Sequence, residues 1–426
     1  MPPHTFVPPP VRSLRDVGLP VLWLLDHALR IFYFQGYLTG NQLADAMALP
    51  FGLVEEYILD HLKREKLIEV KAARHRIGMG GFEYALTSEG ARRAREALER
   101  SQYAGPVPVP LAVYTQAVRQ QARQRTIVTE REMRQALRHL VLREDVFHRL
   151  GPAVNSGSSI FLYGPPGNGK TSIAEAIGRY LLRDTIYIPH AIYIDGQVVV
   201  LYDPLHHHKA NGKTRANNND AQRDRRWIQI HRPFIMVGGE LTLKDLDLIF
   251  DPVTKYYQAP VQVKANGGML LVDDFGRQQV PPKDLLNRWI VPLESRVDYL
   301  TMHTGHKIMV PFDVLAVFST NLPPKDLVDE AFLRRLRHKI HISDPGLEEF
   351  REICRRITKA KGIPYSERGL AYLLQEWYVK HNRPFRATHP RDLCNHVVDI
   401  ARYRGVQPAM TPELLDAAAQ VYFVDM

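Results

Sequence analysis

Apolar residues recur at helical spacing near the start of the chain. From Val21 to Phe32 they fall three or four positions apart, which places them on one face of a helix. A short helix (QLADAM) and a third helix at residues 54–62 follow, and then two strand-like pieces, LIEVKA and GFEYALT, joined by a glycine-rich turn. The order helix, helix, helix, hairpin is typical of a winged helix-turn-helix. The pattern predicts such a domain within residues 1–105.

The pattern changes twice further along the chain. Residues 106–126 begin with alternating prolines (PVPVPL), and we interpret them as a linker to the next domain. Residues 127–344 alternate short apolar runs with helical segments, which predicts an α/β domain with a parallel sheet. The candidate strands are IFLY, AIYID, QVVVLYD, FIMVG, GMLLVDD and FDVLAVFST. Residues 345–426 have a purely helical pattern and are expected to form a smaller helical lid domain.

A glycine-rich loop lies between the strand IFLY and the helix SIAEAIGRYLL. Residues 164–171 read GPPGNGKT and match the pattern G-x-x-x-x-G-K-[ST]. In such a loop, backbone N–H groups and a helix N-terminus surround phosphate oxygens. We expect Lys170 to reach the β- and γ-phosphates of ATP, and Thr171 to ligate Mg²⁺. The predicted nucleotide-binding residues of the loop are Gly164, Pro165, Pro166, Gly167, Asn168, Gly169, Lys170, Thr171 and Ser172.

A second strand, GGMLLV, ends in two adjacent carboxylates, Asp273 and Asp274. Two acids after a buried apolar run are costly unless a cation pairs with them. We expect this strand to lie beside the strand that precedes the glycine-rich loop, so that Asp273 and Thr171 share the Mg²⁺ ion. Asp274 would then orient or deprotonate the attacking water, which makes it the predicted catalytic carboxylate.

These motifs, in this order, resemble the AAA+ superfamily of ATPases over residues 127–426. Asn321, at the end of the strand FDVLAVFST, matches the family's sensor-1 residue, and HPRDL resembles sensor 2, with Arg391 reaching the γ-phosphate. The segment DEAFLRRLRHKI resembles the one that carries the arginine finger. Its candidates are Arg334, Arg335 and Arg337, of which we favour Arg335. Because a finger supplied by a neighbour can be worth about 10³–10⁵ in rate, the resemblance implies an ATPase that forms a homo-oligomeric ring, expected to be a hexamer.

The chain departs from the family at one position and indicates a subgroup at two others. The family usually has Asp-Glu where this chain has Asp273 and Asp274, and the shorter side chain implies slower water activation unless the geometry compensates. The stretch VDYLTMHTGHKIMVPF reads as a hairpin that turns at residues 303–306. It resembles the pre-sensor-1 hairpin of the clade that holds the MoxR-type, magnesium-chelatase-type and enhancer-binding activator ATPases. In that clade a loop reaches into the pore, and residues 238–241 (GGEL) are its candidate tip here. The GAFTGA signature of the activators is absent.

The charge distribution offers an alternative partner. The formal net charge is +10, and most of the excess lies in residues 106–150 and 205–232. A basic segment can bind nucleic-acid phosphates. The candidates for such contacts in the second segment are Arg223, Arg225 and Arg226.

The charges on the third N-terminal helix disfavour DNA binding through that helix. In DNA-binding winged helices this helix enters the major groove with a polar or basic face. Here it exposes Glu55, Glu56 and Asp60, which would repel phosphates. Basic residues occur instead in the wing, at Lys71, Arg74 and Arg76. The pattern therefore favours a protein partner and leaves DNA contact through the wing as the alternative.

Cysteines and histidines indicate no metal site. Cys354 and Cys394 lie in amphipathic helical patterns typical of reduced thiols, so we expect a cytoplasmic protein. The adjacent histidines at 206–208 cannot all reach one metal from a single face. No apolar run is long enough to span a membrane, and we see no secretory signal.

Three functional hypotheses remain. The leading one is a ring-forming ATPase that remodels a protein partner recruited through the N-terminal domain. The second is a DNA-binding, ATP-dependent motor or regulator that uses the wing and the basic loop at 205–232. The third is a nucleotide-gated scaffold with little turnover.

Overall fold

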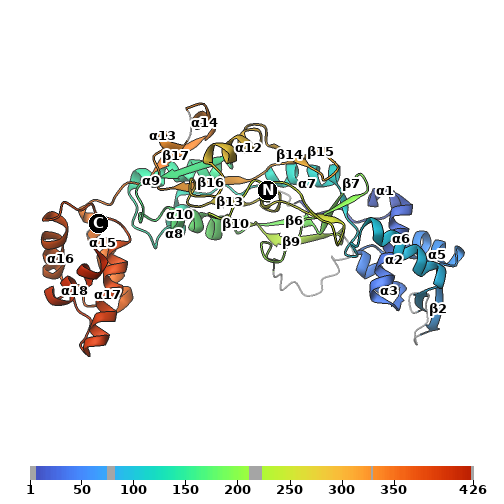
Figure 1. Cartoon of the computed structure of the whole chain (residues 1–426), viewed down its shortest axis with the longest axis horizontal. Helices are drawn as coiled ribbons and strands as arrows, with labels where there is room; N and C mark the ends of the chain where they lie inside the picture. Colours follow the sequence, from blue (N-terminus) through green and yellow to red (C-terminus); the bar gives the residue numbers. More distant parts are fainter. Residues whose placement is uncertain (1–5, 74–81, 211–222, 328–329, 424–426) are drawn as a thin grey trace.

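The computed structural model describes residues 6–73, 82–210, 223–327 and 330–423. Three parts follow one another along an elongated molecule: an N-terminal helical unit, a central region of sheets and a C-terminal helical unit (Figure 1). The wing arginines Arg74 and Arg76 and the loop at 211–222 lie outside the described residues. No helix in the described ranges has both the length and the apolar character needed to cross a lipid bilayer.

The central region is built on a five-stranded sheet whose neighbouring strands are all parallel. The strand order is β10 (Phe234–Val237), β13 (Met269–Val272), β16 (Leu315–Thr320), β5 (Ser159–Tyr163) and β17 (His338–His341). The predicted α/β class with a parallel sheet is confirmed. The expected position of the acidic strand β13 beside β5 is wrong, because β16 lies between them. The carboxyl ends of all these strands still meet at one edge, where ligands bind in such sheets.

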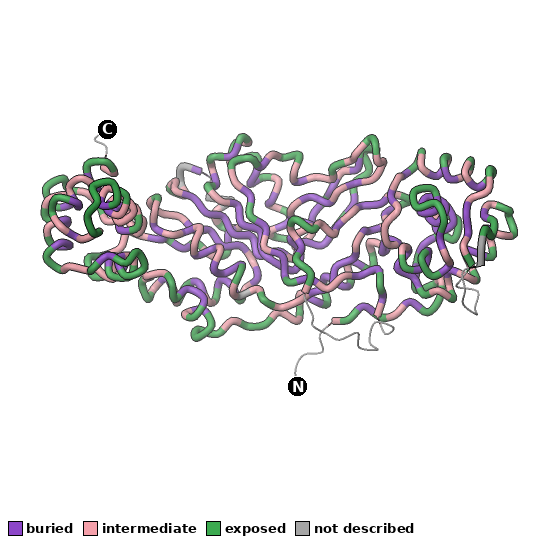
Figure 2. Tube along the Cα trace, turned by 90° about the horizontal axis from the view of Figure 1, so that it is seen from below, coloured by how far each residue is buried: buried purple, intermediate pink, exposed green. Residues whose placement is uncertain are grey.

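Helices cover both faces of this sheet. On one face, Ile160 and Leu162 of β5 pack in a cluster with α8 (Glu130–Ala136), α9 (Glu144–Asn155) and α10 (Lys170–Ala176). On the other face, Phe161 packs with α12 (Pro282–Ser295). Because both faces are buried, the strands read as continuous apolar runs. Figure 2 shows these strands buried along their length.

A second sheet is mixed. Its order is β11 (Ile249–Asp251), β12 (Tyr256–Gln258), β8 (Gln197–Val200), β7 (Ala191–Ile194) and β4 (Val109–Pro110). The strands AIYID and QVVVLYD, expected in the parallel sheet, belong to this second sheet. The reason is the two-residue turn between them: Asp195 and Gly196 have φ values of 46° and 88°. Two positive φ angles are typical of a tight hairpin, which makes β7 and β8 antiparallel neighbours.

Residues 106–126, expected to form a linker, contain β4 and the helix α7 (Leu111–Ala122). Tyr114, Ala117 and Val118 of α7 are buried in a cluster with residues of β6 (Thr185–Pro189) and β9 (Trp227–His231). The segment is therefore part of the packed central region.

The expected hairpin before the strand FDVLAVFST is present. β14 (Val297–Thr301) pairs with β15 (Lys307–Pro311) in antiparallel register. Arg288 of α12 donates to both carboxylate oxygens of Asp298, at 2.6 and 3.1 Å, and Asp298 is fully buried. Such a two-pronged charged contact fixes both distance and orientation, and it holds the hairpin against α12.

The N-terminal unit contains the helices and the strands that the sequence predicts. Its helices are α1 (Leu14–Val17), α2 (Val21–Gln35), α3 (Gly40–Met47), the continuous run α4 (Phe51–Val54), η1 (Glu55–Leu59) and α5 (Asp60–Arg64), and α6 (Ser88–Arg100). An antiparallel sheet has the order β1 (Leu38–Thr39), β3 (Phe82–Leu86) and β2 (Ile68–Ala73). Leu24, Phe32 and Leu62 belong to the core that these elements share.

Arg226 joins the N-terminal unit to the central region. It is 2% exposed, its guanidinium binds the Asp224 carboxylate at 2.9 Å, and it donates to the carbonyls of Asp16 and Val17 in α1. The prediction that Arg226 contacts nucleic-acid phosphates is therefore wrong. Moving this guanidinium to the surface would leave the Asp224 carboxylate buried without a cation, which is strongly unfavourable.

The C-terminal unit is helical, as expected. It comprises α15 (Leu347–Lys361), α16 (Glu367–Leu373) with η6 (Leu374–Val379), α17 (His389–Arg404) and α18 (Pro412–Tyr422). Cys354 and Cys394 lie in its core region as free thiols. Burial raises the pKa of Cys394 to about 11 and that of Cys354 further, so both thiols stay protonated and unreactive.

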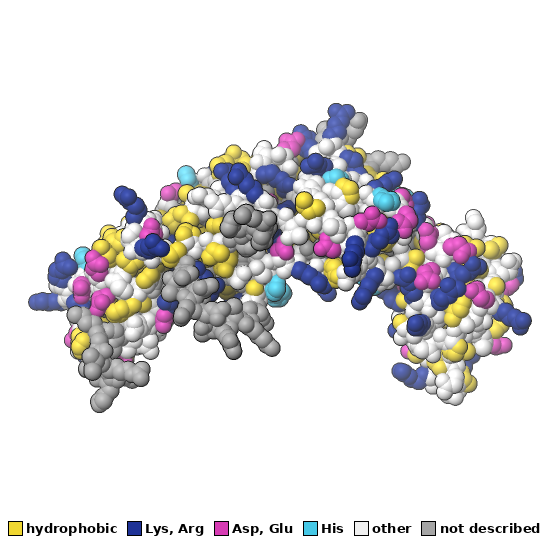
Figure 3. All heavy atoms as spheres, turned by 180° about the vertical axis from the view of Figure 1, so that it is seen from behind, with side chains coloured by type: hydrophobic (Ala, Val, Ile, Leu, Met, Phe, Trp, Pro, Cys, Tyr) yellow, Lys and Arg dark blue, Asp and Glu magenta, His cyan; other side chains and the backbone are white. Residues whose placement is uncertain are grey.

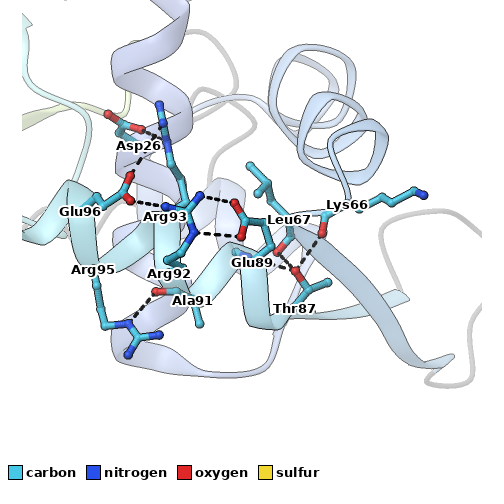
Figure 4. A network of polar contacts seen from close by, with 11 residues as sticks. Asp26, Lys66, Leu67, Thr87, Glu89, Ala91, Arg92, Arg93, Arg95 and Glu96 are labelled. Atoms are coloured by element: carbon cyan, nitrogen blue, oxygen red, sulfur yellow. Dashed lines mark hydrogen bonds and ion pairs between the residues drawn. The ribbon is translucent and has the colours of Figure 1, made fainter.

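Helix α6 is fixed at its start by a side-chain cap and along its surface by ion pairs of Arg92 with acidic neighbours (Figure 4). Thr87 Oγ1 accepts a hydrogen bond from the Gly90 N–H at 3.0 Å and donates to the Lys66 carbonyl at 2.8 Å. This cap holds the helix start against the turn between α5 and β2, which contains Lys66 and Leu67. A Cβ atom on Gly90 would lie 1.9 Å from the Leu67 carbonyl oxygen.

Replacing Gly90 by alanine should lower the free energy of unfolding by about 1–3 kcal/mol, because the Leu67 carbonyl belongs to the backbone and cannot rotate away from the new methyl group. Gly52→Ala is the matched control. Gly52 also lies in the first turn of a helix, and its Cβ would meet no atom within 4 Å. That change should be neutral or stabilising by up to about 1 kcal/mol. Urea unfolding measures both, and equal destabilisation by the two changes would refute the clash.

Candidate functional site

Glycines shape the loop between β5 and α10. Gly164, Gly167 and Gly169 have φ values of 142°, 78° and 82°, which residues with a side chain rarely adopt. A Cβ on Gly164 would lie 2.2 Å from the carbonyl oxygen of Ile342, which follows β17. The loop therefore lies close against the sheet edge, with Pro166 exposed. It ends at the N-terminus of α10, which continues into η3 (Ile177–Leu181), where N–H groups favour an anion.

The Lys170 ammonium group lies under this loop. Its Nζ donates to the carbonyls of Gly164 at 2.9 Å and Pro165 at 2.8 Å, and to Asn321 Oδ1 at 2.7 Å. Burial lowers the pKa of Lys170 to about 8, although Asp274 and Asp273 act in the opposite direction. Phosphate oxygens could replace the two carbonyls as acceptors and would favour the charged form.

Thr171 and Asp273 are in contact across the sheet edge. Thr171 Oγ1 lies 3.0 Å from each carboxylate oxygen of Asp273. A hydroxyl and a carboxylate are oxygen ligands of the kind that Mg²⁺ prefers, and Mg²⁺ is usually held by few protein ligands with water and phosphate completing its shell. These two residues fit a Mg²⁺ ion shared with a phosphate.

Asn321 connects Lys170 to the second acid. Its Nδ2 donates to Asp274 Oδ1 at 3.1 Å, while its Oδ1 accepts from Lys170. Asp274 is exposed and has a φ of 47°, a left-handed conformation that Asp tolerates better than most residues. The carboxylate therefore faces solvent at the sheet edge, where it can accept a proton from water.

Gln278 holds the turn that carries the two acids, and the sequence analysis missed it. Its Nε2 donates to the Asp273 carbonyl at 3.0 Å, and its Oε1 accepts from the Gly276 N–H at 2.8 Å. Gln278 is 9% exposed. A polar residue five positions after the acid carries no sequence signal of its own, because many surface turns contain glutamine.

The C-terminal unit also reaches the loop. Asn168 donates to Asp344 Oδ1 at 2.7 Å, and Asp344 forms an ion pair with Arg386. The Thr388 N–H donates to the Gly167 carbonyl at 2.9 Å. The sequence analysis missed Asp344, Arg386 and Thr388, because their contacts form where the C-terminal unit meets the central region, which no local pattern encodes.

Arg391 and Ser172 line a cavity beside the loop. Its volume is about 150 Å³, and Gly167, Asn168 and Thr388 contribute to its wall. Arg391 is exposed and pairs with the adjacent Asp392 at 2.9 Å. The structure thus brings Arg391 to the side of the loop.

The three candidate finger arginines lie in and just after α14 (Glu330–Arg335), in the segment that leads into β17. Arg334 and Arg335 belong to α14, and Arg337 directly precedes β17. Arg335 Nε lies 2.6 Å from Glu294 of α12, and Arg334 and Arg337 are exposed.

The candidate tip at residues 238–241 is corrected in part. Gly239 and Glu240 are exposed, and Glu240 accepts from the Gly238 N–H at 2.8 Å. Leu241 is 2% exposed and packs in the core on the α12 side of the sheet. An apolar side chain next to this core is buried there, so Leu241 is not part of an exposed tip.

The histidines at 206–208 form no metal site. The Asp203 N–H donates to His207 Nδ1 at 3.0 Å, so the proton is on Nε2, which donates to the Lys264 carbonyl at 2.8 Å. Burial lowers the pKa of His207 to about 4. Within the described residues, no group of three or more His, Cys, Asp or Glu side chains could hold a metal ion.

Comparisons with known proteins give distant likenesses. A family described as a domain of unknown function (DUF8689) matches residues 346–421, within the C-terminal unit. No curated protein matches the chain.

Among solved structures, NtrX from Brucella abortus is 16% identical with a TM-score of 0.40, over 67% of this chain and 56% of its own. This chain thus spans little more than half the length of that NtrX. NtrX in complex with ATP is also 16% identical, with a TM-score of 0.38, over 79% of this chain and 62% of its own. RuvB of Thermotoga maritima, a Holliday junction branch migration motor, is 14% identical with a TM-score of 0.38, over 66% of this chain and 70% of its own. Because these scores lie below 0.5, the function has to be argued from this chain's own residues.

The pKa of Lys170 predicts proton uptake when a nucleotide binds. At pH 8 about half of the Lys170 side chains are neutral, and a bound phosphate favours the charged form. Binding should therefore take up about half a proton at pH 8 and more at pH 9, and affinity should fall as the pH rises through 8. Calorimetry in buffers of different ionisation enthalpy measures this uptake.

Lys170→Arg is the matched control, because a guanidinium keeps its charge throughout this range. Its nucleotide binding should show no comparable proton uptake. The same uptake in both proteins would mean that another group titrates.

Proposed function

We propose that this chain is an ATPase of the AAA+ superfamily, in the clade with a pre-sensor-1 hairpin. The observation that carries the proposal is a continuous chain of hydrogen bonds, from Lys170 through Asn321 to Asp274, at the carboxyl edge of a parallel sheet. Beside it lies the contact between Thr171 and Asp273. A cation, a polar relay, a carboxylate and a metal-binding pair at one glycine-rich loop are the parts that phosphoryl transfer needs.

Each residue has a role in this proposal. Lys170 binds the β- and γ-phosphate oxygens, and the loop N–H groups surround them. Thr171 and Asp273 would hold Mg²⁺, and a bound Mg²⁺ would neutralise charge that develops on the phosphates. Asp274 orients a water molecule and accepts its proton, and Asn321 keeps the carboxylate in position through its 3.1 Å hydrogen bond.

We further propose that a neighbouring copy completes the site. Arg335 is paired with Glu294 of α12, and Arg334 and Arg337 are exposed beside β17, where a neighbouring copy could meet them. A finger from the next subunit would add positive charge opposite Lys170 and stabilise the transition state. A head-to-tail interface of this kind completes the site of every subunit only if the copies close into a ring, for which six subunits remain our expectation.

The partner is proposed to be a protein that binds the N-terminal unit, which has the element order of a winged helix. Two contacts weigh against DNA at the basic segment: Arg226 is buried with Asp224, and Arg225 is paired with Asp45 of α3. On the third helix, Lys63 is paired with Asp60 at 2.9 Å. These pairs reduce the positive charge available to phosphates.

Asp274→Asn should bind ATP normally and lower turnover by about 10²–10⁴, because the amide cannot accept the proton of water. Asparagine tolerates the same left-handed backbone, so the turn should be preserved. Asp274→Glu is the control: it keeps a carboxylate and should turn over at least about tenfold faster than the Asn variant. Phosphate release and nucleotide affinity are measured for all three proteins. Normal turnover in Asp274→Asn would exclude Asp274 as the catalytic carboxylate.

Mixing two inactive variants tests the shared site. Arg335→Ala should bind ATP and assemble, yet hydrolyse about 10³-fold or more slowly. In a mixture with Asp274→Asn, some interfaces pair an intact Asp274 with an intact Arg335, so turnover should reappear. Arg337→Ala is tested alone and in a mixture with Asp274→Asn. The arginine whose single variant is inactive, and whose mixture with Asp274→Asn regains turnover, is the finger. If no mixture recovers activity although the subunits co-assemble, the site is not shared between copies.

A further inference from the structure

A second cavity lies at the opposite end of the helix that begins at Lys170. Its volume is about 360 Å³, and it is bounded by the end of α7, the start of β6 and the residue after β9. The polar groups that matter at its wall are Gln121, Arg183, Asp184, Thr185 and Arg232. None of these residues takes part in the proposed ATPase site, so this cavity requires an explanation of its own.

Arg232 is a buried cation with few partners. Its side chain is 4% exposed, and its Nη1 donates to the Gly267 carbonyl at 2.5 Å. Its Nε lies 3.9 Å from Asp184 Oδ2, too far for a hydrogen bond. A guanidinium has five N–H donors, so most of them are directed at no acceptor in the described residues. Among the described residues, no Arg232 nitrogen is a fully buried atom without a hydrogen-bond partner, so the unused donors face the open cavity, where water or an anion can accept from them.

The surrounding charges do not neutralise Arg232. Arg125 is close enough to oppose the charge of Arg232, and it is itself paired with the Asp313 carboxylate at 3.0 Å. Burial lowers the pKa of Arg232, and Arg125 lowers it further, whereas Asp184 and Asp313 raise it. Asp184 is 41% exposed, so water weakens its attraction for the guanidinium. The local balance is therefore positive.

The other groups of the wall are arranged to contact an anion. Arg183 lies over the Tyr180 ring at 3.7 Å, which orients its guanidinium. Thr185 Oγ1 accepts from Gln229 Nε2 at 2.9 Å, which leaves its own O–H to donate. Gln121 forms two hydrogen bonds with the Tyr187 backbone and acts as a rigid wall.

We propose that this cavity is a binding site for a phosphate group, either free phosphate or that of a small phosphate monoester. Guanidinium groups recognise phosphate through paired N–H donors, and the site offers two of them with a hydroxyl. Its volume is at the lower end of the range for small-molecule pockets. Asp184 belongs to the same wall, and its carboxylate repels an anion there, so it lowers the affinity.

The test is calorimetry with inorganic phosphate and with glycerol 3-phosphate, at constant ionic strength. All proteins carry Lys170→Ala, so that the glycine-rich loop does not contribute. Saturable binding at one site per chain supports the proposal. Tighter binding of the monoester identifies it as the natural source, and tighter binding of inorganic phosphate identifies free phosphate. No saturable binding of either probe overturns the proposal.

Substitutions give the site a signature that a purely structural arginine would not have. Asp184→Asn should tighten phosphate binding by about three- to tenfold, because it removes the repelling carboxylate. Arg183→Gln should weaken it by about tenfold or more, and this exposed position should leave the fold intact. Arg232→Gln should abolish binding if the variant folds.

Arg179→Gln is the control for a general effect of charge. Arg179 is exposed in η3, which ends two residues before Arg183, and it does not line the cavity. It should leave phosphate binding unchanged. Equal effects of Arg179→Gln and Arg183→Gln, or no tightening in Asp184→Asn, would overturn the proposal. Failure here would leave the ATPase proposal untouched, because its residues are distinct.

Discussion

A single ammonium group organises the candidate site. Lys170 can only donate hydrogen bonds, so every group around it must present an oxygen: two loop carbonyls and the amide of Asn321. Since the Asn321 oxygen faces Lys170, its N–H₂ group must face away, towards Asp274. One charge therefore sets both the loop conformation and the orientation of a carboxylate two strands away in the sheet. Only parallel strands that end at the same edge allow this.

The features that can be predicted from the sequence are those encoded by residues close together in the chain. The glycine-rich loop and Asp273 follow spacing rules, and the structure brings them into contact. The strand AIYID belongs to a second sheet because Asp195 and Gly196 form a tight turn after it. The pattern of apolar residues does not indicate this turn. The burial of Arg226 depends on carbonyls more than two hundred residues away in sequence. A charge pattern in the sequence identifies a cation but not the residues it contacts. Contacts between separate units, such as that of Arg226 with α1, therefore cannot be predicted from the sequence.

The backbone conformation at residue 274 explains why an aspartate stands there. Asp274 has a φ of 47°, where aspartate is several-fold more common than longer residues with a Cβ atom. Gln278 keeps the turn in this conformation by binding the Asp273 carbonyl. The chain therefore positions its carboxylate mainly through the backbone, whereas a glutamate would rely on a longer and more mobile side chain. An aspartate at this position therefore suits the geometry of the turn.

The two terminal units lie on opposite sides of the central region (Figure 3). They are attached to it in different ways. The N-terminal unit is fixed to the central region by the buried Arg226 and by the contact of Trp23 with Tyr193, at 5.6 Å. The C-terminal unit is held near the glycine-rich loop, by Thr388 on Gly167 and by Arg356 on the carbonyls of Arg138 and Leu140. A change in the shape of that loop would therefore tilt one end while the other stays in place. The N-terminal unit is therefore anchored independently of the glycine-rich loop, whereas the attachment of the C-terminal unit includes that loop.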